Sequence, residues 1–367
     1  MKVCFFLGGF HQNGGIGRIT AMLANNLVDL DEIQITTLCY CNPKLQNIYQ
    51  LAPEIKQDFF LQSYSSMLKQ LVCGGIFRLR KYLAENDIDV LIACGALFYP
   101  ISVLACKKIK TKCICWEHSD PEGNNDHRGQ YIARKFGIKK SDLNVVLTKR
   151  ALQTYKEKYR ADKTIQVYNP VDKAVFAAAG DYDPESKKII SVGRLTYQKN
   201  FQMAVKIASA VLPAYPDWEW DVFGQGEDLE DLIKLTQQYG IDKQLHFRGQ
   251  VSDLYDRYKE YSFMVMTSRY EGFPMTLLEG CGNALPLVSF DIPTGPSEII
   301  DDGENGYLLT ANDYDGMVKC IVRLIENTEE RKMMSVKSRK KSEIYRIEDV
   351  CNAWYQVLQM VTGNERN

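Results

Sequence analysis

Short apolar runs alternate along the chain with longer segments in which apolar residues recur every three or four positions. The short runs are typical of strands buried on both faces of a sheet, and the longer period is typical of amphipathic helices. The strands predicted in the first half are Val3–Leu7, Gln34–Cys39, Val90–Cys94, Cys113–Trp116 and Asn144–Leu147. Those predicted in the second half are Ile189–Gly193, Trp220–Phe223, Leu245–Arg248, Phe263–Met266 and Leu287–Phe290.

Helical segments lie between these strands in both halves. The predicted helices are Ile16–Leu30, Ser66–Asn86, Phe201–Leu212, Glu227–Tyr239, Asp253–Tyr261 and Pro274–Asn283. Strands that alternate with helices form parallel sheets covered by helices on both faces. The pattern therefore predicts an α/β protein built from two doubly wound, Rossmann-like domains that face each other across a cleft.

The domain boundaries follow from chain length and from one segment rich in turn formers. At 367 residues the chain is long enough for two domains of ordinary size. Residues 171–188, which contain AAAGDYDPES, have the composition of a linker. We expect one domain over 1–170 and a second domain over 189–346. The amphipathic helix 347–361 is expected to pack back on the first domain.

Composition indicates a globular cytoplasmic protein. The mean hydropathy is -0.27, and the uncharged stretch Val90–Cys106 contains Gly95 and Pro100, so it predicts a strand, a turn and a helix in preference to a membrane span. Eleven cysteines without a Cys-x-x-Cys pair favour a reducing compartment. The start of the chain, MKVCFFLGGF, resembles a first strand more than a signal peptide.

Charge is distributed unevenly between the two halves. Residues 1–170 carry 23 Lys and Arg against 15 Asp and Glu, a balance of +8, whereas residues 171–367 carry 22 against 31, a balance of -9. The basic stretches Arg78–Lys81, Lys107–Lys112 and Arg134–Lys163 are candidate contacts with an anionic membrane, or else ordinary solvated helix faces. Nucleic acid is not an expected partner, because acids dilute the positive charge and no known nucleic-acid module is present.

A glycine-rich segment, NGGIGR, follows the first predicted strand and contains Gly14, Gly15 and Gly17. Glycines at the start of a helix let the backbone approach a ligand, and the free amides there favour an anion such as a phosphate. A tight turn between strand and helix explains the same glycines equally well. The spacing also differs from the dinucleotide fingerprint G-x-G-x-x-G.

The segment SVGRLTYQKN ends a predicted strand at Gly193 and places Arg194 and Lys199 in the loop before the next helix. Ligands of open α/β sheets bind outside the carboxyl ends of the strands. Two cations at that position could neutralise a diphosphate from two sides. Ordinary surface positions for the arginine and the lysine are the alternative.

The segment SRYEGFPMTLLEGCG carries two carboxylates around a helix start. Pro274 suits the first helical position, so Glu271 precedes the helix and Glu279 lies in its second turn among apolar neighbours. A carboxylate in such surroundings needs polar partners, and sugar hydroxyls qualify. Glu271 could instead serve only the helix dipole. The amides of Met275 and Thr276 would point at the same anion as the two cations.

Taken together, these motifs resemble family 4 of the retaining glycosyltransferases, which have the GT-B fold. The resemblance rests on the two glutamates separated by seven residues, on the preceding GR…K pattern and on NGGIGR. The run FDIPTGPSEIIDDGENGYLL (290–309) is similar to members that build bacterial exopolysaccharide, capsule or lipid-linked oligosaccharide.

The resemblance implies that domain 1–170 is the acceptor side and that domain 189–346 binds the nucleotide-sugar donor. It also implies a role for each candidate of the second half. Glu271 would contact hydroxyls of the transferred sugar, with the amides of Gly272 and Phe273 nearby, and Glu279 would hold the ribose of the nucleotide. Arg194 and Lys199 would neutralise the leaving diphosphate.

In the first half, the resemblance implies that the Gly14–Gly17 loop closes on the diphosphate from the other domain. It also implies that His118, in WEHSD, lies beside the donor sugar. Without the resemblance, a lone histidine in a polar loop is more often structural.

The resemblance implies transfer of a hexose or N-acetylhexosamine, with retention, from a nucleotide sugar to a saccharide or polyprenyl-diphosphate-linked acceptor. UDP is the expected nucleotide, with GDP second. No metal site and no cofactor are expected, because no Asp-x-Asp is well placed for a cation and the protein cations would replace it. A peripheral position at the inner face of the plasma membrane is expected from the basic half and from lipid-linked acceptors.

Two alternatives remain at this point. One is another enzyme of the GT-B fold, such as a nucleotide-sugar epimerase or a phosphorylase. The other is a two-domain solute-binding protein without catalysis, although such proteins are usually exported.

Overall fold

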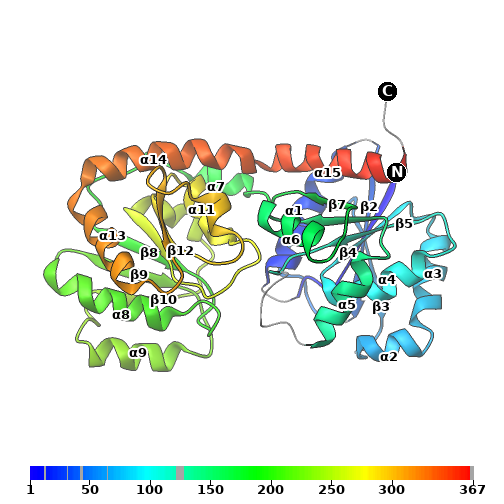
Figure 1. Ribbon diagram of the computed structural model, residues 1–367, viewed down its shortest axis with the longest axis horizontal. Helices are drawn as coiled ribbons and strands as arrows, with labels where there is room; N and C mark the ends of the chain where they lie inside the picture. The colour runs from blue at the N-terminus through cyan, green and yellow to red at the C-terminus, as the bar shows by residue number, and fades with distance from the viewer. Residues whose placement is uncertain (12–13, 31, 42–43, 64, 121–127, 364–367) are drawn as a thin grey trace. The chain divides into compact units, whose positions relative to one another are not determined.

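The structure is a computed structural model that describes the chain except for residues 12–13, 31, 42–43, 64, 121–127 and 364–367 and the side chains of residues 41 and 72. The chain divides into two compact units (Figure 1). Unit 1 comprises Met1–Pro170 and Ile347–Asn367, and unit 2 comprises Val171–Arg346. Each unit contains one parallel sheet with helices, so the predicted α/β class is confirmed.

The sheet of unit 1 has seven strands in the order β3-β2-β1-β4-β5-β6-β7, and all of its strand pairs are parallel. The hydrophobic pattern did not predict β3 and β7. They lie at the two edges of the sheet, where one side of a strand has no partner and apolar residues are fewer. The strands are β1 (Lys2–Leu7), β2 (Gln34–Cys41), β3 (Lys56–Leu61), β4 (Val90–Cys94), β5 (Lys112–Trp116), β6 (Leu143–Val146) and β7 (Thr164–Gln166).

The helices of unit 1 include one from the end of the chain. Helix α15 buries a stripe of apolar residues and packs along α1, and its Trp354 lies against Trp116 with ring centroids 4.8 Å apart. The helices are α1 (Gly15–Leu27), α2 (Met67–Val72), α3 (Gly75–Glu85), α4 (Tyr99–Cys106), α5 (Arg128–Ile138), α6 (Lys149–Glu157) and α15 (Ile347–Thr362).

The helix predicted over residues 66–86 is wrong as one continuous element. The segment forms α2 and α3, which are separated at Gly74, whose φ of 81° is left-handed and therefore incompatible with a continuing helix. By contrast, the uncharged stretch 90–106 forms a buried strand, a short 3₁₀ turn and a helix, as predicted. No helix in the described part of the chain has the length and apolar character needed to cross a membrane.

The sheet of unit 2 has six strands in the order β10-β9-β8-β11-β12-β13, again with every pair parallel. The hydrophobic pattern did not predict β13, which is also an edge strand. The strands are β8 (Lys188–Val192), β9 (Glu219–Phe223), β10 (Leu245–Gly249), β11 (Phe263–Met266), β12 (Leu287–Asp291) and β13 (Gly306–Thr310).

Helices cover both sides of this sheet: α8 and α9 lie on one side, and α11 and α14 on the other (Figure 1). Residues 171–188 were expected to form a linker, but they fold with unit 2 and include α7. The helices are α7 (Lys173–Ala178), α8 (Phe201–Val211), α9 (Leu229–Gln238), α10 (Leu254–Arg257), α11 (Met275–Gly282), α12 (Pro296–Ile299), α13 (Tyr314–Glu326) and α14 (Thr328–Ser342).

The strand order of each sheet contains one reversal. The chain runs outward from β1 in one direction and from β4 in the other, and in unit 2 it does so from β8 and β11. Open α/β sheets bind ligands at such a point, beside the loops that follow the two central strands. In unit 2, these loops are those of SVGRLTYQKN and SRYEGFPMTLLEGCG.

Candidate active site

The loop after β8 is held close to the sheet by glycines. The amide of Gly193 donates to the carbonyl of Phe223 at 2.9 Å. A Cβ added at Gly224, where φ is +141°, would lie 1.9 Å from the carbonyl oxygen of Gly193. A Cβ at Gly193 would lie 3.1 to 3.2 Å from side-chain carbons of Lys199, so this lysine passes directly over the glycine.

Lys199 and Glu271 connect the loops that follow the two central strands of unit 2. Lys199 Nζ lies 2.5 Å from Glu271 Oε1, and the two side chains are only 14% and 8% exposed. Gln198 Nε2 donates to the carbonyl of Tyr270 at 3.0 Å, and the hydroxyl of Thr294 donates to the carbonyl of Glu271. The sequence motifs did not single out Gln198 or Thr294, because their contacts join positions about 70 and 20 residues apart.

Arg194 is the exposed cation of this site. Its guanidinium has no hydrogen bond or ion pair with any residue that the structure describes. Lys199, by contrast, already has a carboxylate partner. The loop after β8 thus offers one cation with full capacity for a new anion and one cation whose charge is shared with Glu271.

The entry to α11 is a buried turn. Pro274, predicted to be the first helical residue, instead has extended backbone angles and precedes the helix, which begins at Met275. A Cβ at Gly295, where φ is +104°, would lie 2.2 Å from Pro274 Cδ, so the loop after β12 packs against the proline. The ring of Phe273 is buried and lies 5.9 Å from that of Tyr345.

The first residues of α11 remain accessible. Gly272, Met275 and Thr276 are half-buried, and no side chain caps the start of the helix. Backbone amides at a helix start are donors that attract negative charge. The start of α11 lies four residues after Glu271 in the chain, so its amides, like Lys199, follow a central strand of the unit 2 sheet.

Glu279 lies in the second turn of α11 and is almost completely buried. Its Oε2 accepts a hydrogen bond from the hydroxyl of Tyr258 at 2.7 Å. The hydrogen bond from Tyr258 agrees with the prediction that the buried carboxylate of Glu279 needs polar partners. The sequence did not identify Tyr258, because it lies on a short 3₁₀ turn 21 residues earlier in the chain.

The glycines predicted to form a loop lie instead at the start of α1 in unit 1, with Gly14 as the N-cap and Gly15 and Gly17 inside the helix, and they differ from one another. Gly14 and Gly15 are exposed, and a Cβ at either would meet no atom within 4 Å. Gly17 is buried, and its Cβ would lie 3.1 Å from the carbonyl oxygen of Gly9. Close packing therefore explains Gly17. A Cβ at Gly14 or Gly15 would be unobstructed by the described residues, but the Gly14 amide already donates to the Tyr49 hydroxyl at 3.2 Å.

His118 also lies in unit 1, two residues after the end of β5. Its ring packs on Trp116 with centroids 4.2 Å apart, and burial lowers the pKa of the imidazole to about 4. The buried Nε2 atom has no hydrogen-bond partner among the described residues. His118 is therefore neutral at physiological pH and retains the capacity for one polar contact.

Several basic side chains are already engaged inside the fold. Arg134, which the sequence placed in a basic stretch, is buried and pairs with Glu117 at 2.5 Å. Arg80 donates to carbonyls at the end of α4, and Lys110 lies 2.5 Å from an oxygen of Asp87. The net charge of the first half thus overstates the positive surface that is available to a partner.

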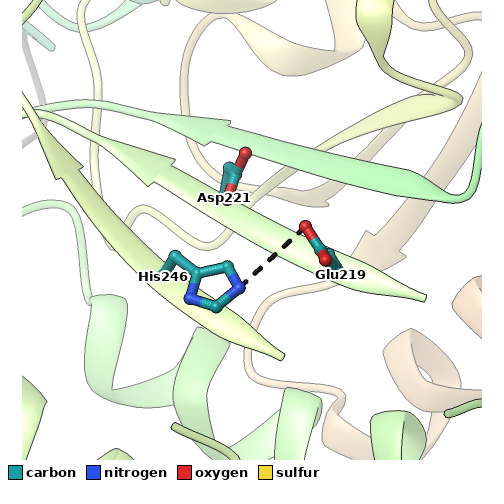
Figure 2. Close-up of side chains that lie close together, drawn as sticks. All are labelled: Glu219, Asp221 and His246. Carbon is teal, nitrogen blue, oxygen red and sulfur yellow. Dashed lines mark ion pairs between the residues drawn. The ribbon is translucent and has the colours of Figure 1, made fainter. Parts of the chain in front are cut away.

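A cluster of three potential metal ligands lies on β9 and β10 of unit 2. Figure 2 shows Glu219 and Asp221 on β9 beside His246 on β10, with potential ligand atoms within 4.8 Å of one another. Arg248 Nε lies 2.8 Å from one oxygen of Asp221, and the Tyr261 hydroxyl donates to the other at 2.8 Å. The guanidinium of Arg248 makes this cluster a charge network and opposes the binding of a further cation.

The structure thus brings Gly193, Lys199 and Glu271 into direct proximity within unit 2. Glu279 has a separate buried environment beside Tyr258. The glycines 14, 15 and 17 and His118 belong to the other unit.

Comparisons with known proteins agree with these motifs. The family model described as Glycosyltransferase Family 4 matches residues 13–175, and the one described as Glycosyl transferases group 1 matches residues 173–341. The chain is 30% identical to the amylovoran biosynthesis glycosyltransferase AmsD of Erwinia amylovora over 97% of this chain and 99% of that protein. It is 28% identical to an uncharacterized glycosyltransferase of Haemophilus influenzae over the same shares.

The fold agrees as well. The structure of S. aureus TarM in complex with Fondaparinux, alpha-GlcNAc-glycerol and UDP matches with a TM-score of 0.80 at 14% identity, over 98% of this chain and 100% of that one. Both halves match a glycosyltransferase model, and a full-length relative is 30% identical. The chain is therefore a glycosyltransferase of family 4, with the GT-B fold.

Proposed function

We propose that this enzyme transfers a hexose or N-acetylhexosamine from a UDP-sugar to a saccharide or lipid-linked saccharide during synthesis of a surface polysaccharide. The contact between Lys199 and Glu271 carries the proposal. It places a cation and a carboxylate side by side at the carboxyl edge of the unit 2 sheet, beside the reversal of strand order. A nucleotide sugar needs such a pairing, because its diphosphate is anionic and its sugar presents hydroxyls.

The chemistry follows from the charge that develops during transfer. The bond between the anomeric carbon and the diphosphate oxygen breaks, the acceptor hydroxyl attacks that carbon, and its proton leaves with the nucleoside diphosphate. Arg194, Lys199 and the amides at the start of α11 would stabilise the departing diphosphate. Attack on the same face of the sugar would retain its configuration, as the family resemblance implies.

The proposal includes no metal and no cofactor. The two cations after β8 would supply the positive charge that a divalent ion supplies in other transferases. The network of Glu219, Asp221 and His246 supports this view, because Arg248 already neutralises its acids. Activity that is unchanged by EDTA is the expected result.

The candidate residues of unit 1 would also bind the donor. Gly14 and Gly15, where an added Cβ would meet no atom within 4 Å, would let backbone amides approach the diphosphate, and the Gly14 amide would exchange its bond to the Tyr49 hydroxyl for the ligand. The neutral imidazole of His118 would use Nε2 for a hydroxyl of the sugar. Glu279, with one oxygen bonded to Tyr258, would hold the ribose.

UDP and a polysaccharide acceptor are supported by the similar proteins. TarM was solved with UDP, and AmsD is named for amylovoran biosynthesis. Family membership favours transfer over epimerisation, phosphorolysis or passive solute binding.

An anionic membrane surface is the proposed location of a lipid-linked acceptor. Leu68 on α2 and Phe77 on α3 are 73% and 72% exposed, and the exposed cations Lys69 and Arg78 adjoin them in sequence. Apolar side chains beside cations suit the interface of an anionic bilayer. We assign α2 and α3 as the contact with the inner face of the plasma membrane.

A thermal-shift panel with UDP, GDP and their sugars tests the proposal. UDP should raise the melting temperature, and UDP-sugars should be turned over with release of UDP. Arg194→Met should abolish both effects, whereas Arg257→Met, which removes an arginine from an exposed pair with Asp253, should change neither. Stabilisation by no uridine nucleotide, or full turnover by Arg194→Met, would contradict the assigned donor site.

A further inference from the structure

Unit 1 contains a buried carboxylate, that of Glu117, which is held in place by several hydrogen bonds. Glu117 immediately follows β5 and is 2% exposed. Its Oε2 accepts hydrogen bonds from Arg134 Nε at 2.5 Å and from the Tyr155 hydroxyl at 2.8 Å. Its Oε1 accepts from the Ser119 hydroxyl at 2.8 Å and from the amides of His118 and Ser119 at 3.2 Å each. The carboxylate therefore has five donors.

These donors come from three separate parts of the fold. Arg134 belongs to α5, Tyr155 belongs to α6, and the remaining donors belong to the loop after β5. Arg134 Nη2 also reaches the Ser119 hydroxyl at 3.2 Å. Burial raises the pKa of Glu117, but the charge of Arg134 and the side-chain hydrogen bonds from Arg134, Ser119 and Tyr155 outweigh it and lower the pKa, so the group is charged at neutral pH.

Stabilisation of the fold is by itself a weak explanation for the buried ion pair of Glu117 and Arg134. Burying an ion pair costs desolvation energy that is comparable to the attraction gained, and apolar residues of similar volume often stabilise a fold as well. What the ion pair adds is geometry, because Oε1 holds two successive backbone amides. Those amides belong to His118 and its neighbour, so the peptide that carries the imidazole has little freedom.

The same peptide is constrained from the other side. Trp116, which precedes Glu117, packs on the His118 ring and on Trp354 of α15. With the backbone held by Glu117 and the ring held by Trp116, the Nε2 atom of His118 is presented in one orientation. That atom has no partner among the residues that the structure describes.

We propose that Glu117, held by Arg134 and Tyr155, is a positioning residue that fixes the His118 imidazole for its contact with the donor sugar. The inference rests on the proposed function of His118. Glu117 touches neither donor nor acceptor, and it acts only through the backbone amides of 118 and 119. A glutamine keeps one acceptor oxygen and replaces the other with a donor NH2 group, so it cannot accept all five hydrogen bonds, and Glu117→Gln should loosen the loop.

A double-mutant cycle separates positioning from a general structural role. His118→Ala should lower kcat/KM about 100-fold, and Glu117→Gln should lower it about 10- to 100-fold, since a misplaced group costs this much. If Glu117 acts through His118, the double variant should match His118→Ala alone. Losses that multiply in the double variant, or full activity of Glu117→Gln, would overturn the inference. Tyr155→Phe, which removes one donor only, provides a milder variant if Glu117→Gln does not fold.

A second readout is independent of activity. The ring nitrogen shifts of His118, assigned with His118→Ala among the four histidines of the chain, should change in Glu117→Gln and in Tyr155→Phe. Unchanged ring nitrogen shifts would overturn the inference whatever the activity of His118→Ala. Full activity of His118→Ala, by itself, would contradict only the proposed function.

Unit 2 offers a matched control for these variants. Glu330 also binds an arginine and a tyrosine, with Arg323 Nε at 2.8 Å and the Tyr307 hydroxyl as donors. Glu330→Gln should change stability without altering kcat/KM or the His118 shifts. An equal loss of activity in Glu330→Gln would mean that any disrupted carboxylate of this kind impairs the enzyme, which would overturn the specific role of Glu117.

Discussion

Lys199 Nζ lies 2.5 Å from Glu271 Oε1, and this ion pair joins two loops that are 72 residues apart in the chain. Both side chains are largely buried. A donor that arrives at this site would meet a lysine whose charge is already shared. The pair therefore fixes the position of both groups before a ligand binds, and the diphosphate would compete with the carboxylate for the lysine.

Replacing one or both partners separates stability from catalysis. Lys199→Met should leave Glu271 buried and unpaired, and so it should destabilise the fold by about 2–4 kcal/mol. Lys199→Met combined with Glu271→Gln should recover most of that stability while kcat stays reduced by about 100-fold or more. Chemical denaturation and kcat measure the two effects. Lys234→Met, in an exposed pair with Asp231, is the control and should change neither. A double variant with normal kcat would remove Lys199 and Glu271 from the reaction.

The bond between Tyr258 and Glu279 should matter for donor binding. Tyr258→Phe removes the donor at 2.7 Å from the buried carboxylate, which should cost about 1.5–3 kcal/mol of stability and raise KM for the UDP-sugar. Tyr261→Phe removes a similar bond, at 2.8 Å to Asp221. It should cost comparable stability without raising KM. If both variants raise KM equally, the effect comes from lost stability and not from the ribose site.

The low pKa of His118 makes a prediction about pH. Burial lowers this pKa to about 4, against 6.5 for an ordinary histidine, so between these values the unfolded chain binds a proton that the folded chain does not. The free energy of unfolding should therefore fall as the pH drops from about 6.5 to about 4, with a contribution from His118 of up to about 1.4 kcal/mol per pH unit. Denaturation curves of the wild type and His118→Ala measure that contribution as their difference. Parallel pH profiles for the two proteins would show that His118 is not held neutral.

Gly193 tests how closely Lys199 depends on the loop beneath it. In Gly193→Ala, the new methyl would lie 3.1 to 3.2 Å from flexible side-chain carbons of Lys199, so the lysine should shift at a cost of less than about 1.5 kcal/mol while kcat falls. In Gly224→Ala, the methyl would lie 1.9 Å from a backbone oxygen at a left-handed φ, so stability should fall by more than about 2 kcal/mol. Melting curves and kcat of both variants test this contrast. A Gly193→Ala enzyme with wild-type kcat would show that the lysine position is uncritical.

Membrane contact through α2 and α3 should depend on their exposed apolar side chains. The double variant Leu68→Ser and Phe77→Ser should bind vesicles that contain anionic lipid several-fold more weakly than the wild type. Its stability should hardly change, because both side chains are more than 70% exposed. Val336→Ser is the control, since Val336 is 70% exposed on α14 of the other unit. Equal binding by the wild type and the double variant would place any membrane contact elsewhere.

Much of the fold follows from local pattern. The predicted strands Val90–Cys94 and Phe263–Met266 coincide with β4 and β11, because a central strand of a parallel sheet is buried on both faces and must be apolar throughout. The edge strands β3, β7 and β13 lack that requirement, and the pattern missed them. The apolar period predicted one continuous helix over residues 66–86, but the chain forms two helices. The left-handed backbone of Gly74 ends the first helix, whatever residues surround it.

The sequence by itself determined the α/β class, the central strands and the chemical types of the site residues, since burial and helix periodicity act between neighbours in the chain. Only the tertiary structure decided that Lys199 lies against Glu271, that Tyr258 serves Glu279 and that Arg134 is buried beside Glu117. Such contacts depend on the order of strands in each sheet, which joins residues from distant parts of the chain. The hydrophobic pattern along the chain does not predict that order, because many strand orders would bury the same apolar runs equally well.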